Sequence, residues 1–210
     1  NVVNYISGNL IIGNAQLAQA NPVLNNLEGL ESLTAIGGNL VVIHNSVLDS
    51  LSGLQSLRMI SGHLELISNP SLASIGRLDE LEHIAGSVRI VRNPTLTDLS
   101  SMDALASTGG DLIIYDNASL TSLEGLEGMT SIGGSLVIVG NTSMAGVGCL
   151  NALSTIHGRI EISNNANINC LAGLDNVDAA SVTRLSMVNN YLLSECNVQS
   201  ICDYLAVPGA

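Results

Sequence analysis

The stretch Ile132-Gly133-Gly134-Ser135-Leu136-Val137-Ile138-Val139-Gly140-Asn141 decides the fold, because its pattern recurs along almost the whole chain. Its closing asparagine recurs with a constant 24-residue period and no slippage. A fixed period of this length is typical of a solenoid, in which each turn of chain buries its apolar side by stacking on its neighbours. The asparagine column consists of Asn45, Asn69, Asn93, Asn117, Asn141 and Asn165.

Each repeat carries two kinds of apolar periodicity. Leu136 and Ile138 follow Gly134 at steps of two, and the other repeats do the same. Period-two alternation after a glycine predicts a strand, and strands stacked in register predict a parallel sheet along the solenoid. After the asparagine, apolar residues return at every third position, which favours short strands, bends or 3₁₀ turns over a long helix. The four columns of this second kind begin at Leu48, Leu51, Leu54 and Leu57.

The asparagine column is predicted to be structural. A buried amide has donors and an acceptor to satisfy, and asparagines in register can bond the turning backbone and the amides of adjacent turns. Asn117 and Asn141 also begin triplets that match the glycosylation acceptor pattern. We expect both side chains to face inward and to remain unmodified.

The N-terminal end departs from the 24-residue frame. The interval from Asn14 to Asn45 is longer than one repeat by seven positions. The excess falls in the Ala- and Asn-rich residues 15–26, which contain Pro22. An insertion of this composition predicts a loop that bulges from the first complete turn.

The C-terminal end predicts a cap. Val198, Ile201, Cys202 and Leu205 follow the i, i+3, i+4, i+7 spacing of an amphipathic helix, and Pro208 and Gly209 come after it. The last turn of a solenoid exposes an apolar face that such a helix can cover. We therefore predict a single domain over residues 1–210: an irregular first turn with an insertion (1–35), regular turns (36–193) and a cap (194–210).

Composition excludes several classes of partner. Hydrophobic residues make up 46% of the chain but aromatic residues only 2%, so Leu, Ile and Val must fill the thin layers of the core. The net charge of −12, without a single lysine, disfavours binding to nucleic acids and electrostatic attachment to anionic lipid. No apolar run approaches the roughly 20 residues that span a membrane, so direct membrane insertion is not expected.

Four cysteines lie in the last third of the chain, at Cys149, Cys170, Cys196 and Cys202. Their spacing matches no common zinc motif, and an even number near one end is compatible with one or two disulfides in an oxidising compartment. The pairs 149–170 and 196–202 are plausible, although the spacing allows other connectivities and free buried thiols remain an alternative.

The repeat resembles a known family. The phrases Ile36-Gly37-Gly38-Asn39-Leu40-Val41-Val42 and Ile132-Gly133-Gly134-Ser135-Leu136-Val137-Ile138, each followed by an asparagine and a Leu-x-x-Leu series, resemble the receptor L domain family. That family is related to leucine-rich repeats and supplies ligand-binding modules to receptor ectodomains. Residues 196–205 are similar to a segment that ends the repeats of bacterial leucine-rich-repeat-like surface proteins.

This resemblance extends over about residues 6–205 and carries its own expectations. It implies a mainly β, right-handed parallel β-solenoid with a short C-terminal helix. It also implies binding in place of catalysis. The implied location is extracellular or at the cell surface, either secreted or anchored through a segment outside this chain.

No catalytic, cofactor or metal site is expected. The four histidines, His44, His63, His83 and His157, occupy different positions in the repeat and should not converge, so we interpret them as solvated surface residues. The chain lacks a Gly-x-Ser-x-Gly motif and a phosphate-binding loop, and its acidic residues lack the alternating arrangement of a calcium loop.

The outward positions of the predicted sheet form the candidate binding surface. Solvent-facing strand positions are usually polar, but five consecutive turns carry an aliphatic residue or a tyrosine at the second outward position. A contiguous apolar strip on a protein surface generally marks a contact. The candidate partner-binding residues are Glu65, Ile67, Arg89, Val91, Ile113, Tyr115, Val137 and Val139.

Three occupants of this strip remain open: a partner, a second copy of the chain, or a neighbouring domain of the same protein. The leading hypothesis is a non-enzymatic, secreted or surface-displayed binding or adhesion module that recognises a protein, or a glycan, through its main parallel sheet. A protein is favoured because only Tyr115 offers an aromatic platform for a sugar ring. The alternative is a structural or self-associating surface component that forms a homodimer through the sheet face.

Overall fold

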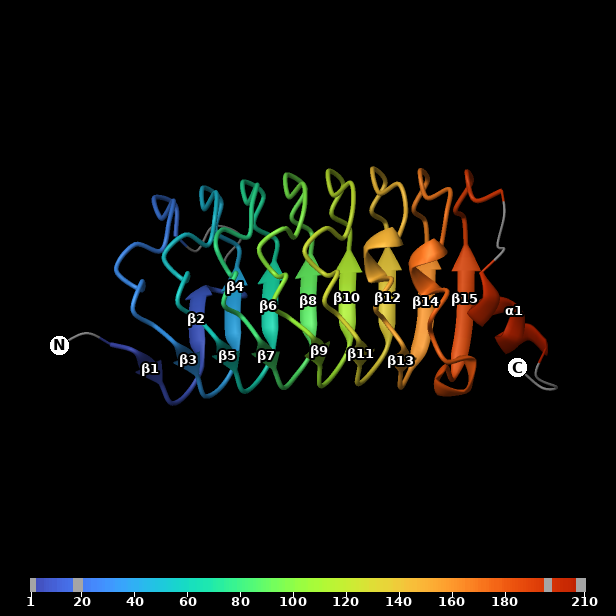
Figure 1. Cartoon of the computed structure of the whole chain (residues 1–210). Coiled ribbons are helices and arrows are strands. Elements are labelled where there is room, and N and C mark those ends of the chain that lie inside the picture. The colour runs from blue at the N-terminus through green and yellow to red at the C-terminus, as the bar shows by residue number, and fades with distance from the viewer. Residues whose placement is uncertain (1–2, 17–20, 195–197, 207–210) are drawn as a thin grey trace.

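The computed structural model describes residues 3–16, 21–194 and 198–206. Successive turns stack along one axis, from the first turn in blue to the last in red (Figure 1). Each turn contributes one strand to each of two parallel sheets, except the last, which contributes β15 to the main sheet alone. The mainly β architecture, the parallel sheets and the single short C-terminal helix confirm the predicted β-solenoid.

The main sheet has eight strands in the order β15-β14-β12-β10-β8-β6-β4-β2. The strands follow the repeat glycines, where period-two alternation predicted them. Their bounds are β2 Leu10–Gly13, β4 Leu40–Ile43, β6 Leu64–Ile67, β8 Val88–Val91, β10 Leu112–Tyr115, β12 Leu136–Val139, β14 Arg159–Ser163 and β15 Arg184–Val188.

A second, short sheet has seven strands in the order β1-β3-β5-β7-β9-β11-β13. Each strand has two residues and precedes a main-sheet strand, and the sequence did not predict this sheet. The bounds are β1 Tyr5–Ile6, β3 Ala35–Ile36, β5 Met59–Ile60, β7 His83–Ile84, β9 Ser107–Thr108, β11 Ser131–Ile132 and β13 Thr155–Ile156.

The segments that follow the asparagines form the third side of the solenoid. Their leucines at every third position are buried, as predicted: Leu48, Leu51, Leu54 and Leu57 are all 0% exposed. In the described residues these segments are mostly turns and bends, and 3₁₀ helices occur there as η1 (Gly148–Leu150) and η2 (Ala172–Leu174). One hydrophobic core therefore runs the length of the stack.

A left-handed residue ends most main-sheet strands and turns the chain inward. His44, Ser68, Arg92 and Asp116 have φ between 53° and 57°, and Gly140 occupies the same place with φ 73°. This backbone conformation is uncommon for residues other than glycine. It directs the next residue, the ladder asparagine, into the core.

The asparagines form a continuous ladder. From Asn69 to Asn190, each Oδ1 accepts hydrogen bonds from both the backbone N–H and the Nδ2 of the preceding asparagine, at 2.9–3.4 Å. Each Nδ2 from Asn45 to Asn190 also donates to a strand carbonyl of the preceding turn. The members from Asn45 to Asn165 are 0% exposed. Asn117 and Asn141 therefore face inward, as expected.

The first turn differs from the prediction in the size and place of its insertion. Leu10 pairs with Leu40, which lies one repeat and six further residues along the chain, so the insertion has six residues, not seven. Asn21, not Asn14, is the first ladder residue: it lies one full repeat before Asn45 and donates through Nδ2 to its Oδ1 at 2.7 Å. The insertion therefore lies between β2 and Asn21, and residues 17–20 fall outside the described part.

Helix α1 (Gln199–Ala206) lies at the C-terminal end of the stack (Figure 1). Val198 and Ile201 are each 3% exposed and belong to the core, and the Ser200 hydroxyl donates to the Leu174 carbonyl at 2.6 Å. The prediction of a buried apolar face is wrong for the second half of the helix, where Cys202 and Leu205 are exposed. The helix thus covers the last turn through its N-terminal half. Pro208 and Gly209 lie outside the described residues.

Substitution of Asn93 by leucine should destabilise the fold strongly. Leucine cannot accept hydrogen bonds from the backbone N–H and the Nδ2 of Asn69, and it cannot donate one to the carbonyl of Leu66. The substitution also opens no space in which water could replace these bonds. We expect a loss of about 2–4 kcal/mol in the free energy of unfolding, measured by urea denaturation and far-ultraviolet circular dichroism. Asn169→Leu, at an exposed position, is the control and should change stability by less than ~0.5 kcal/mol. Equal stability of the two variants would contradict the ladder.

Candidate functional site

The outward surface of the main sheet, here called the main-sheet face, consists of two columns of side chains. Both columns are in register from strand to strand, so equivalent residues are neighbours. The first column is Ile11, Val41, Glu65, Arg89, Ile113, Val137, Glu161 and Ser186. The second column is Gly13, Ile43, Ile67, Val91, Tyr115, Val139, Ser163 and Val188.

The eight predicted contact residues all lie on this face, but they differ in exposure. Ile67, Val91, Ile113 and Tyr115 are half-buried. Val137 and Val139 expose only 7% and 9%, and so offer a partner little surface. The prediction that these residues bind a partner remains a prediction.

The sequence did not predict two outward apolar residues, which lie at the ends of the two columns. Ile11 exposes 58% of its surface and Val188 exposes 51%. Ile11 lies in the first turn, whose six-residue insertion concealed its place in the repeat. Val188 lies shortly before Asn190, in a repeat that is one residue longer than the others. Its position is therefore shifted by one residue from the 24-residue frame.

The charged residues on the main-sheet face are two ion pairs and Arg184, which lies next to Arg159 on the edge strand β15. Glu65 and Arg89 lie side by side on β6 and β8, with 3.8 Å between Oε1 and Nε. Arg159 and Glu161 form the second pair on β14, with 3.1 Å between Nε and Oε2. The strands between these pairs, β10 and β12, carry only apolar residues and Tyr115 outward. The face is therefore apolar at its centre, and charge lies on either side.

A groove of about 420 Å³ adjoins the second column at the carboxyl ends of the strands. Its walls include left-handed residues that directly follow the column: His44 follows Ile43, and Arg92 follows Val91. Arg92 and Asp116 lie 3.7 Å apart between Nε and Oδ2, so one wall carries both charges. The sequence signal for this groove is the variable polar residue before each ladder asparagine. The lining residues are His44, Ser68, Pro70, Arg92, Pro94 and Asp116.

A second polar ladder borders the amino ends of the main-sheet strands. In each turn one side chain accepts a hydrogen bond from the backbone N–H of the equivalent residue in the next turn, at 2.7–3.3 Å. His63 takes part through Nδ1, which accepts from the Ser87 N–H at 2.8 Å. His63 is therefore exposed, as predicted, and also serves as a structural hydrogen-bond acceptor. The accepting residues are Asn9, Asn39, His63, Ser87, Asp111 and Ser135.

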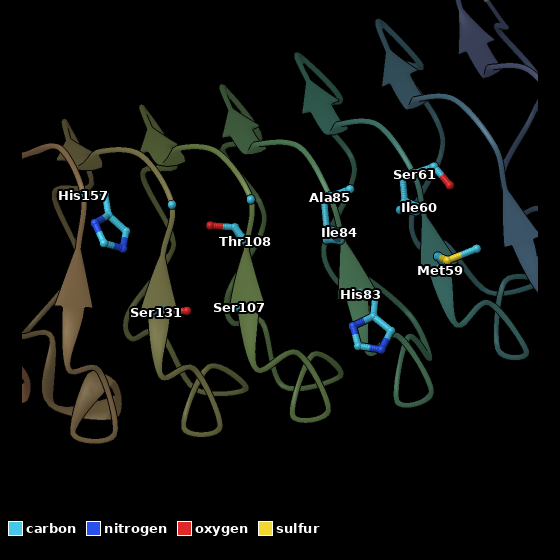
Figure 2. Close-up of a pocket in the computed structure, with 12 residues that line it drawn as sticks. Met59, Ile60, Ser61, His83, Ile84, Ala85, Ser107, Thr108, Ser131 and His157 are labelled. Carbon is cyan, nitrogen blue, oxygen red and sulfur yellow. The ribbon is translucent and has the colours of Figure 1, made fainter.

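The short sheet carries a separate hollow of about 420 Å³. Figure 2 shows His83 and Met59 toward one end of it, His157 at the other, and the small residues of β9 and β11 between them. Gly109 and Gly133 are required in its floor, because a Cβ at either position would lie 2.0 or 2.4 Å from a carbonyl oxygen of the preceding turn.

The histidines do not converge on one site, as predicted. His83 and His157 belong to turns separated by three strand spacings, which places them roughly 14 Å apart. His44 lies in the groove beside the main sheet, and His63 lies in the outer polar ladder. The four histidines therefore lie at separate places on the solenoid.

The described residues offer no metal site and no membrane-spanning helix. They contain no group of three or more His, Cys, Asp or Glu side chains that could hold a metal ion. Within residues 3–16, 21–194 and 198–206, no helix has the length and apolar character to cross a membrane.

The cysteines that the structure describes are free. Cys149 is half-buried, and Cys170 and Cys202 are exposed, so the disulfide between Cys149 and Cys170, one of the pairings left open by the sequence, is not formed. Cys196 lies outside the described residues, as does the pair 196–202. Burial, followed by a hydrogen bond to Glu127, raises the pKa of the Cys149 thiol. The Cys170 Sγ accepts a bond from the Ala172 N–H at 3.3 Å.

Comparison with known proteins bears on the first half of the solenoid. A family model described as the receptor L domain matches residues 4–96, which span β1 to β8. The matched family is one of non-catalytic binding domains and supports the resemblance seen in the repeats. No curated protein and no solved structure matches the chain.

Cys170 should react with a maleimide faster than Cys149 at pH 8. The thiolate is the reacting form, and burial of Cys149 raises its pKa, so less thiolate is present and access is poorer. Peptide mapping by mass spectrometry over a time course should show modification of Cys170 first, by several-fold in rate. A peptide pair joined through Cys149 and Cys170, or equal rates, would contradict the structure.

Proposed function

We propose that this protein is a non-enzymatic, extracellular binding module that recognises a protein through its main-sheet face. The observation that carries the proposal is the second outward column, in which the half-buried Ile67, Val91 and Tyr115 lie on three successive strands and are flanked by the nearly buried Ile43 and Val139. An apolar run of this length on an outward sheet face is a common mark of an interaction surface.

The groove beside this column supports the proposal. It lies next to the apolar residues and combines two prolines with the Arg92–Asp116 pair. An apolar area beside a few charged groups is the usual anatomy of a protein interface, in which the apolar part supplies affinity and the charges supply orientation. A partner could therefore rest on the column and place a polar side chain in the groove.

A protein suits the face better than a glycan. The face has one aromatic side chain, Tyr115, and sugar recognition generally uses such rings as stacking platforms. The match to a family of extracellular receptor domains supports the expected location outside the cell or at its surface. The alternative is a structural or self-associating component whose face binds another copy, and the opposite charges of Glu65 and Arg89 on neighbouring strands are compatible with it.

Photo-crosslinking from the main-sheet face tests the proposal. Benzoylphenylalanine in place of Tyr115 should form adducts when the protein is incubated with the extracellular proteins of its source. The same photoreactive residue in place of Met59, an exposed position on the short sheet, is the matched control and should form few. Adducts from position 59 but not from position 115 would overturn the assignment of the face.

A further inference from the structure

The main-sheet face is self-complementary about one particular twofold axis. From this geometry we propose that the face binds a second copy of the chain, about an axis that is parallel to the strands and passes between β6 and β8. This inference rests on the proposed function, because it takes the main-sheet face to be a protein-binding surface and names its partner.

The direction of the axis decides which columns meet. When two sheet faces are opposed about a twofold axis parallel to the strands, strand direction is kept and strand order is reversed. The first column then faces the first column, and the second faces the second. An axis perpendicular to the strands would place the first column against the second, and the charge of Glu65 would then lie against aliphatic side chains.

The position of the axis between β6 and β8 matches charge with charge. Glu65 then lies opposite the partner's Arg89, and by symmetry Arg89 lies opposite the partner's Glu65. The two intramolecular Glu65–Arg89 pairs thereby become one four-charge cluster around the axis. Charges that are buried together in this way keep compensating partners on both sides.

The same axis matches apolar residues with apolar residues. On the strands next to the axis, Ile67 faces the partner's Val91. One strand further out, Val41 faces the partner's Ile113 and Ile43 faces the partner's Tyr115. At the edge of the overlap, Ile11 faces the partner's Val137. Ile11, which exposes 58% of its surface, is then covered at that edge, although Val137, at 7%, contributes little contact area of its own.

The polar end of the face stays outside the overlap. Six strands, β2 to β12, oppose one another, while the outward polar residues Glu161 on β14 and Ser186 on β15 lie beyond the overlap. An axis between β8 and β10 would place Glu65 against Val137. An axis between β10 and β12 would match Arg89 with Glu161, but it would bury Ser186 against Glu65 and leave Ile11 uncovered. The position between β6 and β8 alone of these three matches every charged residue that it buries.

The interface should be weak on its own. Six strands at ~4.8 Å spacing and four residues at ~3.3 Å give an opposed area of roughly 29 Å by 13 Å. This is smaller than the ~800 Å² per partner of a standard interface, so association should depend on concentration. The interface therefore lies at the low end of interface size, and the dimer is expected to form only at high protein concentration.

Charge reversal with rescue tests the axis. Sedimentation velocity of the 210-residue chain from about 10 μM to 1 mM should show a monomer–dimer equilibrium. Glu65→Arg and Arg89→Glu should each weaken it at least about tenfold, because symmetry creates two like-charge contacts. The double variant Glu65→Arg/Arg89→Glu should return to within about threefold of the original chain.

Two controls accompany this test. Glu80→Arg breaks a more exposed ion pair with Arg58 away from the main-sheet face, and should leave the equilibrium unchanged. Thermal unfolding of every variant should remain close to that of the original chain, since exposed pairs contribute little to stability. Rescue of Arg89→Glu by Glu161→Arg, in place of Glu65→Arg, would overturn the proposed axis.

The outcome also separates this inference from the proposed function. A chain that stays monomeric to 1 mM, while the photoreactive residue at position 115 captures a different protein, overturns the dimer and leaves the binding face intact. A monomeric chain with no adducts from position 115 overturns both. Adducts of twice the mass of the chain, together with the charge rescue, support the dimer.

Discussion

The hydrogen bonding of stacked asparagine amides is the interaction on which the rest of this structure depends. Each Oδ1 accepts two N–H groups of the preceding turn, and each Nδ2 donates to a carbonyl of that turn. These bonds can form only if successive turns keep the same register. A buried amide that misses its partners costs about 1–3 kcal/mol, so a slip of one residue would be opposed at every turn. The ladder therefore fixes the rise and the alignment of the turns.

The alignment of the buried asparagines also aligns the outward side chains of the main sheet. Because each asparagine follows a left-handed residue, the strand before it ends at the same height in every turn. Side chains of the same strand position then stand next to one another as columns. The apolar run on the second column and the Glu65–Arg89 pair on the first are consequences of that alignment. Any binding by the main-sheet face thus depends on the same amides that hold the core.

The sequence predicted the parts of the structure that repeat with strong side-chain patterns. The main-sheet strands, the inward leucines and the buried asparagines all follow from columns in which the same kind of residue recurs. The short sheet was missed because a two-residue strand contributes one inward side chain, such as Ile36, and offers no alternation to detect. Asn21 was missed because the six-residue insertion sits between it and its strand. The low exposure of Val137 depends on packing between turns, which periodicity does not reveal.

Hydrogen exchange of the ladder amides, followed by nuclear magnetic resonance, tests this account most directly. The side-chain Nδ2 protons of Asn69, Asn93, Asn117 and Asn141 should remain protected long after the side-chain protons of exposed Asn169 have exchanged. They should also exchange at similar rates, since each is bonded to the next. Exchange of the ladder side chains as fast as that of Asn169 would contradict the claim that stacked amides set the register of the solenoid.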